Sequence, residues 1–240
     1  MIEQHTSAFA IGGQSYAVQR YAQKHGTATR PPVVVLHGVD GLGTQSGVEI
    51  RKFAEQMAGE GFLVFVPNYF DANDGADTLP LEELFGRRVP RVASYLPRVA
   101  AAVEHVLKQA DVDAGHVGLV GLSLGGGLAL QYAHGVPAGT VKALVDYFGY
   151  IADPRIFANV HRLPPTLILH HNADEIVKMA ASSQLLLDAL DRSAVVHDHQ
   201  FYDDVNPAGR HHPFLPGGHA DVDSRSRSIA WLKAHLIPSR

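Results

Sequence analysis

The stretch that decides the fold is residues 116–133, HVGLVGLSLGGGLALQYA. It opens with the apolar run His116–Val120, passes through Gly121-Leu122-Ser123-Leu124-Gly125, and continues as an apolar segment to Ala133. The run before the glycines predicts a buried strand, and the segment after them predicts a helix. Between the two, the chain must turn sharply within a few residues.

The turn has the pattern G-x-S-x-G, and its position between a strand and a helix is typical of a nucleophile elbow. Glycine is needed on both sides because a Cβ atom would crowd so tight a turn. The central residue, Ser123, is then forced into a strained backbone conformation with its hydroxyl exposed. A phosphate-binding turn is the alternative, but neither G-x-G-x-x-G nor G-x-x-x-x-G-K-[ST] occurs in the chain.

Outward from this stretch, short apolar runs alternate with longer segments of helical periodicity. The expected strands are Val33–Leu36, Phe62–Val66, Val141–Phe148, Thr166–His170 and Val195–Tyr202. The expected helices are Val48–Met57, Met179–Leu190 and Ser224–Leu236. Residues 78–109 are expected to form two helical pieces, interrupted at Pro90 and Pro97. Continuous apolar strands predict a mostly parallel central sheet with helices on both faces, an α/β fold. Tyr16–Tyr21 alternates instead, which predicts an antiparallel edge strand.

Composition agrees with a compact globular protein and excludes several classes of function. Of the 240 residues, 46% are hydrophobic and 18% are charged, so we expect a single domain spanning residues 1–240. The net charge of −4, without a Lys/Arg-rich run, predicts no nucleic-acid or membrane partner. The N-terminus lacks the pattern of a signal peptide and there is no cysteine, so we expect a cytoplasmic monomer or homodimer.

A serine nucleophile needs two N–H donors to hold the oxyanion that forms on the substrate. An elbow supplies one from the residue after the serine, here Leu124. The second is expected from the loop after the Val33–Leu36 strand, and we assign it to the N–H of Val39.

The acid that orients the catalytic histidine is expected after the serine and past a buried strand. Asp174 follows the strand Thr166–His170, and its short side chain suits a turn. Glu175 is the first alternative, and Asp146, at the end of another apolar run, is the second.

The base is expected between the last strand and the last helix. His211, His212 and His219 lie there. We favour His212, which precedes Pro213-Phe214, and keep His219 as the second choice. No metal site is expected, because the 15 histidines include no H-E-x-x-H pattern.

Taken together, these motifs resemble the dienelactone hydrolase family of α/β-hydrolases. The resemblance rests on segments spread along the chain: Leu36-His37, Gly41-Leu42, Pro67–Phe70, Gly121–Gly126, Asp174–Val177 and His212-Pro213-Phe214. It implies an α/β-hydrolase fold, no cofactor and a triad of Ser123, Asp174 and His212. The best-known members carry a cysteine at the position of Ser123 and a glutamate at that of Gly38, so the resemblance implies a serine-nucleophile variant that acts as a carboxylesterase.

The expected reaction is the cleavage of small soluble esters or lactones through an acyl-enzyme. The short connection between Phe148 and Thr166 predicts no large lid. Arg87, Arg88 and Arg91 are candidates for binding a substrate carboxylate, although such clusters more often form a solvated face. The alternatives are an amide or acyl-peptide hydrolase with the same triad, and a non-catalytic ligand-binding protein of the same fold.

Overall fold

The computed structural model describes residues 1–24, 29–204, 214 and 216–237. Its strands are β1 (Ile2–Ile11), β2 (Gln14–Gln23), β3 (Pro32–Leu36), β4 (Leu63–Pro67), β5 (Val117–Leu122), β6 (Val141–Tyr147), β7 (Thr166–His171) and β8 (His197–Tyr202). Its helices are α1 (Gln45–Gly59), α2 (Leu81–Arg88), α3 (Val92–Leu107), α4 (Leu124–Gly135), α5 (Arg155–Ala158), α6 (Ser183–Leu190) and α7 (His219–Leu236). Short 3-10 turns cover Ala72–Asp74, Val89–Arg91, Val160–Arg162 and Met179–Ala181.

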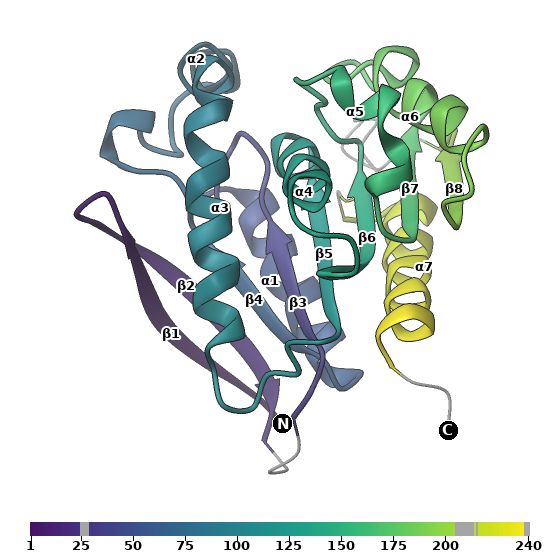
Figure 1. Cartoon of the computed structure of the whole chain (residues 1–240). Helices are drawn as coiled ribbons and strands as arrows, with labels where there is room; N and C mark the ends of the chain where they lie inside the picture. The colour runs from purple at the N-terminus through teal and green to yellow at the C-terminus, as the bar shows by residue number, and fades with distance from the viewer. Residues whose placement is uncertain (25–28, 205–213, 215, 238–240) are drawn as a thin grey trace.

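The eight strands form one sheet in the order β1-β2-β4-β3-β5-β6-β7-β8 (Figure 1). From β4 to β8 neighbouring strands are parallel, while β1 pairs antiparallel with β2 and β2 pairs antiparallel with β4. β3, β4, β5 and β7 are buried along their whole length, because helices cover both of their faces. The predicted mostly parallel α/β sheet is confirmed.

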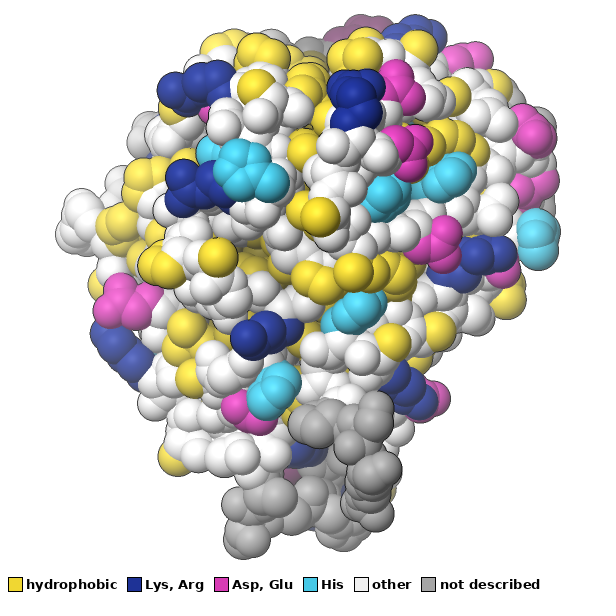
Figure 2. All heavy atoms as spheres, turned by 45° about the vertical axis from the view of Figure 1, so that its right-hand side comes forward, with side chains coloured by type: hydrophobic (Ala, Val, Ile, Leu, Met, Phe, Trp, Pro, Cys, Tyr) yellow, Lys and Arg dark blue, Asp and Glu magenta, His cyan; other side chains and the backbone are white. Residues whose placement is uncertain are grey.

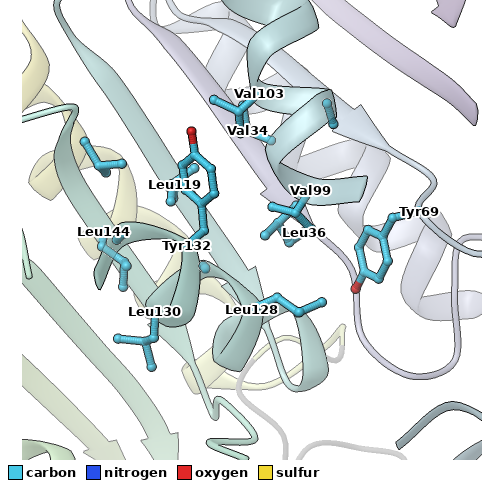
Figure 3. Packing of buried hydrophobic residues seen from close by; sticks show 14 of the residues in the cluster. Val34, Leu36, Tyr69, Val99, Val103, Leu119, Leu128, Leu130, Tyr132 and Leu144 are labelled. Atoms are coloured by element: carbon cyan, nitrogen blue, oxygen red, sulfur yellow. The ribbon is translucent and has the colours of Figure 1, made fainter. Parts of the chain in front are cut away.

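The helices lie in two layers, one on each face of the sheet (Figure 1). α3, α4 and α6 pack their apolar side chains into one core cluster, whereas α1 and α7 pack into the other. Figure 3 shows how Leu128 and Tyr132 of α4, Val99 of α3 and Leu36 of β3 meet in the first cluster. α4 is therefore held between the sheet and α3, which leaves its N-terminal end at the carboxyl end of β5.

Three expectations about single elements were wrong. The strand around Tyr16–Tyr21 is antiparallel, but it is not the edge, because β1 pairs along its outer side. Pro97 does not interrupt α3: burial of residues such as Val99 and Val103 against the sheet offsets the one hydrogen bond that proline removes. The last helix begins at His219 rather than at Ser224.

In the part of the chain that the structure describes, no large lid covers the sheet, as expected. The connection between β6 and β7 contains only the four-residue helix α5 and a 3-10 turn. On the face shown in Figure 2, basic, acidic and histidine side chains are interspersed rather than gathered in a patch of one sign. Within the ranges that the structure describes, no helix has the length and apolarity needed to cross a bilayer.

Candidate active site

Ser123 occupies the sharp turn between β5 and α4, as the motif predicts. Its φ of 52° and ψ of −115° place a non-glycine residue in a region that costs about 1–3 kcal/mol. A Cβ atom at Gly121 would lie 2.4 Å from the carbonyl oxygen of Gly125, and one at Gly125 would lie 2.2 Å from that of Leu36. Both glycines are therefore required, because the turn packs against its own backbone and against β3.

The backbone of Ser123 is tied to the neighbouring strand and to the loop beyond it. Its N–H donates to the carbonyl of Tyr147 at 2.9 Å, and its carbonyl accepts from Tyr150 at 2.8 Å. The first turn of α4 also donates to this carbonyl, from Gly126 and Gly127. These bonds hold the strained conformation in place and leave the side chain to face a cavity of about 520 Å³.

Both predicted oxyanion donors lie beside Ser123. Leu124 is the first residue of α4, where backbone N–H groups have no partner within the helix. The Cβ position of Gly38 would be 3.5 Å from the Cβ of Ser123, so the loop that carries Val39 runs close to Ser123, and Val39 lines the cavity. The carbonyl of Gly38 accepts from Gly41, which turns the Val39 N–H of the same trans peptide to the opposite side.

His37 stiffens this loop, a role that the sequence analysis did not identify. Its ring stacks on Tyr69 with 4.0 Å between centroids and meets the edge of Phe70, and the hydroxyl of Tyr69 donates to its carbonyl. Nδ1 lies 2.9 Å from the carbonyl of Gly38. Complete burial lowers the pKa of His37 to about 4, so the ring is neutral and supports the loop rather than acting as a base.

Asp174 lies past the end of β7 and is 3% exposed. One of its carboxylate oxygens, Oδ1, accepts from the N–H groups of Ile176 and Val177 at 2.8 and 3.0 Å. Oδ2 lies 3.3 Å from Nε2 of His170, a fully buried histidine whose Nδ1 contacts Ser183. Asp174 is thus oriented by the turn that follows it, and it lies against a histidine that the sequence analysis had treated only as a strand residue.

The two alternative acids lie in different surroundings. Glu175 is exposed, so its side chain is not held in the way that Asp174 is. Asp146 is fully buried beneath the elbow, where its Oδ1 would be 2.4 Å from a Cβ at Gly126 and 2.2 Å from one at Gly149. Burial raises the pKa of Asp146 to about 7, and the N–H of Gly149 offsets part of that rise. Its position beneath the turn fits a packing role.

The favoured base, His212, and its neighbour His211 lie outside the described residues. Phe214, two residues after His212, is buried against Tyr147 and Phe53, with ring centroids 5.4 and 5.6 Å away. Phe214 lines the same cavity as Ser123, and so does Ile176, two residues after Asp174. Residues close in sequence to His212 and to Asp174 therefore line the same cavity as Ser123.

His219, the second choice for the base, is the first residue of α7 and is exposed. Its ring faces Tyr202, with 6.5 Å between centroids. Among the residues that the structure describes, it is not part of the cavity wall. No three His, Asp or Glu side chains of the described residues gather into a possible metal site.

The three arginines proposed for a substrate carboxylate are engaged elsewhere. Arg87 pairs with Glu83 at 2.8 Å on the exposed side of α2, and Arg91 pairs with Asp74. Arg88 is fully buried, pairs with Asp77 at 2.8 Å, and donates to the carbonyl of Val39 at 2.7 Å. None of the three is among the described residues that line the cavity.

Solved structures with the same fold include several hydrolases. A dienelactone hydrolase-like promiscuous phosphotriesterase from metagenomic libraries has a TM-score of 0.80 at 17% identity, with 98% of this chain and 99% of that chain covered. A dienelactone hydrolase from Anabaena variabilis has a TM-score of 0.71 at 18% identity, with the same coverage. An acylaminoacyl peptidase from Pyrococcus horikoshii has a TM-score of 0.75 at 12% identity, and this chain covers 42% of it.

A comparison with curated proteins finds no match. The dienelactone hydrolase family model, however, matches residues 18–235, which include the elbow, the acid and the loop of the favoured base. With the α/β-hydrolase fold and this match, the chain is a hydrolase that belongs to the dienelactone hydrolase family.

Proposed function

We propose that the protein is a serine hydrolase that cleaves carboxylic esters or lactones of small soluble substrates through an acyl-enzyme. The observation that carries this proposal is the strained Ser123, which opens onto a cavity at the N-terminal end of α4. A hydroxyl in this position, next to free backbone N–H groups, is the arrangement that acyl transfer requires.

In the proposed mechanism, His212 accepts the proton of Ser123 as the serine oxygen attacks the substrate carbonyl. The N–H groups of Leu124 and Val39 stabilise the resulting oxyanion, and Asp174 stabilises the imidazolium. The imidazolium then protonates the leaving alcohol. A water molecule, activated by the same histidine, releases the acid from Ser123 in the second half of the cycle.

Labelling with a fluorophosphonate tests the nucleophile. The probe should modify the protein stoichiometrically at the peptide that contains Ser123, and Ser123→Ala should abolish both labelling and the hydrolysis of 4-nitrophenyl esters. Ser94→Ala on the exposed side of α3 is the matched control and should keep both. A protein that binds a small ligand but stays inert to the probe would support the non-catalytic alternative.

The assignment of the base is tested by comparing His212→Ala with His219→Ala. Loss of the base should lower kcat by about a thousandfold or more, as removal of a triad member does in other serine hydrolases. We expect that loss from His212→Ala and not from His219→Ala. The reverse result would move the assignment to His219. Turnover of matched anilides at rates comparable with those of the esters would favour the amide-hydrolase alternative.

A further inference from the structure

The lining of the cavity in front of Ser123 combines apolar and polar side chains. The apolar ones include Leu79, Leu81, Leu84, Phe85, Ile176 and Phe214. The polar ones include Asp40, Thr44, Gln45, Ser46 and Asp77. The described lining therefore includes two carboxylates and neither lysine nor arginine.

The two carboxylates differ in how their charge is balanced. Asp77 pairs with the buried guanidinium of Arg88 at 2.8 Å and accepts from the N–H of Gly43 at 2.7 Å. Among the described residues, Asp40 accepts a hydrogen bond from the hydroxyl of Thr44, at 2.9 Å, and no basic side chain forms an ion pair with it. Asp40 thus contributes a negative charge that no cation of the described residues neutralises by direct contact.

Asp40 lies close to the place where the substrate reacts. The Cβ position of Gly38 is 3.0 Å from Oδ1 of Asp40 and 3.5 Å from the Cβ of Ser123. At so short a range, in a cavity lined in part by apolar side chains, a charge on the substrate interacts strongly with a carboxylate.

The N-terminus of α1 contributes Thr44, Gln45 and Ser46 to the same cavity lining. Its macrodipole supplies a partial positive charge of about half a unit. A whole negative charge on Asp40 exceeds this partial charge. The hydroxyl of Thr44 holds one oxygen of Asp40 and leaves the other toward Gly38.

On the basis of the proposed esterase function, we propose that Asp40 determines the charge of the substrate that this site accepts. This carboxylate near Ser123 favours esters that carry an ammonium group on an apolar chain, accepts neutral esters, and disfavours esters that carry a carboxylate. The engagement of Arg87, Arg88 and Arg91 in other contacts points the same way, because none of them offers a site for a substrate carboxylate.

Three 4-nitrophenyl esters of similar length test this selectivity: the hexanoate, the 5-(trimethylammonio)pentanoate and the mono-ester of adipic acid. The rate measured with Ser123→Ala is subtracted for each ester, which removes the contribution of spontaneous hydrolysis. For the wild-type protein we expect kcat/KM to be at least tenfold higher for the cationic ester than for the anionic one, with the neutral ester between them.

Asp40→Asn should reduce that ratio at least tenfold, because the amide keeps the size of the side chain and removes its charge. Asp188→Asn is the matched control: Asp188 accepts from Gln184 on α6 outside the described cavity wall, so the ratio should persist. Equal turnover of the cationic and anionic esters by the wild-type protein would overturn the inference even if Asp40→Asn failed to fold. A ratio of kcat/KM for the cationic and anionic esters that stays unchanged in Asp40→Asn would also overturn it. No turnover of any ester above the Ser123→Ala blank would refute the proposed function instead.

Discussion

At the scale of single residues, the elbow depends on glycines, because a Cβ atom at their positions would clash with nearby backbone atoms. Gly127, in the second half of the first turn of α4, would place a Cβ atom 1.9 Å from the carbonyl oxygen of Tyr150. That oxygen belongs to the backbone of the loop after β6, whose Tyr150 N–H donates to Ser123. The close approach of this loop to α4 therefore requires a glycine and also holds the backbone of Ser123.

Gly127→Ala should lower the free energy of unfolding by at least about 2 kcal/mol, since neither backbone can move without breaking these bonds. Gly86→Ala is the matched control in another helix. Gly86 is exposed in α2 with nothing within 4 Å of its Cβ position, so alanine should raise the free energy of unfolding by about 0.5–1 kcal/mol. Urea denaturation measures both. Equal effects of the two substitutions would contradict the steric explanation.

At the scale of elements, α7 is joined to α1 by a buried ion-pair network. Arg225 of α7 contacts Asp221 at 2.8 Å and Glu49 of α1 at 3.1 Å, and its guanidinium lies 4.4 Å from the centre of the Phe214 ring. Glu49 also pairs with Lys52 at 2.8 Å. The network holds two helices of one layer together and fixes Phe214, the described residue nearest in sequence to the favoured base.

Arg225→Met should cost about 3 kcal/mol of unfolding free energy, because it leaves Asp221 without its cation and Glu49 with only Lys52. Arg227→Met, two residues along the same helix, is the control. Arg227 pairs with Asp223 but is 40% exposed, so its loss should cost less than about 1 kcal/mol. Chemical denaturation of both variants measures the difference. If Arg225→Met lowered the free energy of unfolding no more than Arg227→Met does, the network would not join the helices in the way described.

At the scale of the whole molecule, two buried groups give stability opposite dependences on pH. Burial lowers the pKa of His37 to about 4, so its contribution to stability is lost as the pH falls from about 6.5 toward 4. Burial raises the pKa of Asp146 to about 7, so the folded state binds a proton that the unfolded state has released, and stability is lost as the pH rises from about 4 toward 7. Between about pH 4 and 6.5 the two effects oppose each other.

Asp146→Asn should therefore remove the pH dependence of stability that comes from Asp146. The difference in unfolding free energy between Asp146→Asn and the wild type should grow in favour of the variant by about 1.4 kcal/mol per pH unit from about pH 4 to 7, and then level off. Urea denaturation at pH 5 and pH 8 measures it, and all other titrating groups are common to both proteins. A difference that is the same at the two pH values would show that the carboxyl of Asp146 does not titrate in this range.

Much of the fold could be predicted because its signals are local. The apolar runs of β3 to β7, the break at Pro90 and the elbow at Ser123 each depend on residues that are neighbours in sequence. The long strand β1 escaped prediction, since its residues are mostly exposed and its stability comes from pairing with β2. The prediction of a break at Pro97 was wrong for a similar reason: the packing of α3 against the sheet outweighs the local preference of proline against the helix interior.

The candidate site divides in the same way. The sequence by itself determined the elbow, its two glycines and the turn that carries Asp174, because steric demands and turn preferences act between near neighbours. Only the tertiary structure decided that Arg88 forms an ion pair with Asp77, that His170 lies against Asp174, and that the carboxylate of Asp40 lies near Ser123 with no cation of the described residues paired to it. Each of these depends on which charges from distant segments meet, and a charge keeps or loses its effect according to the partner that the fold brings to it.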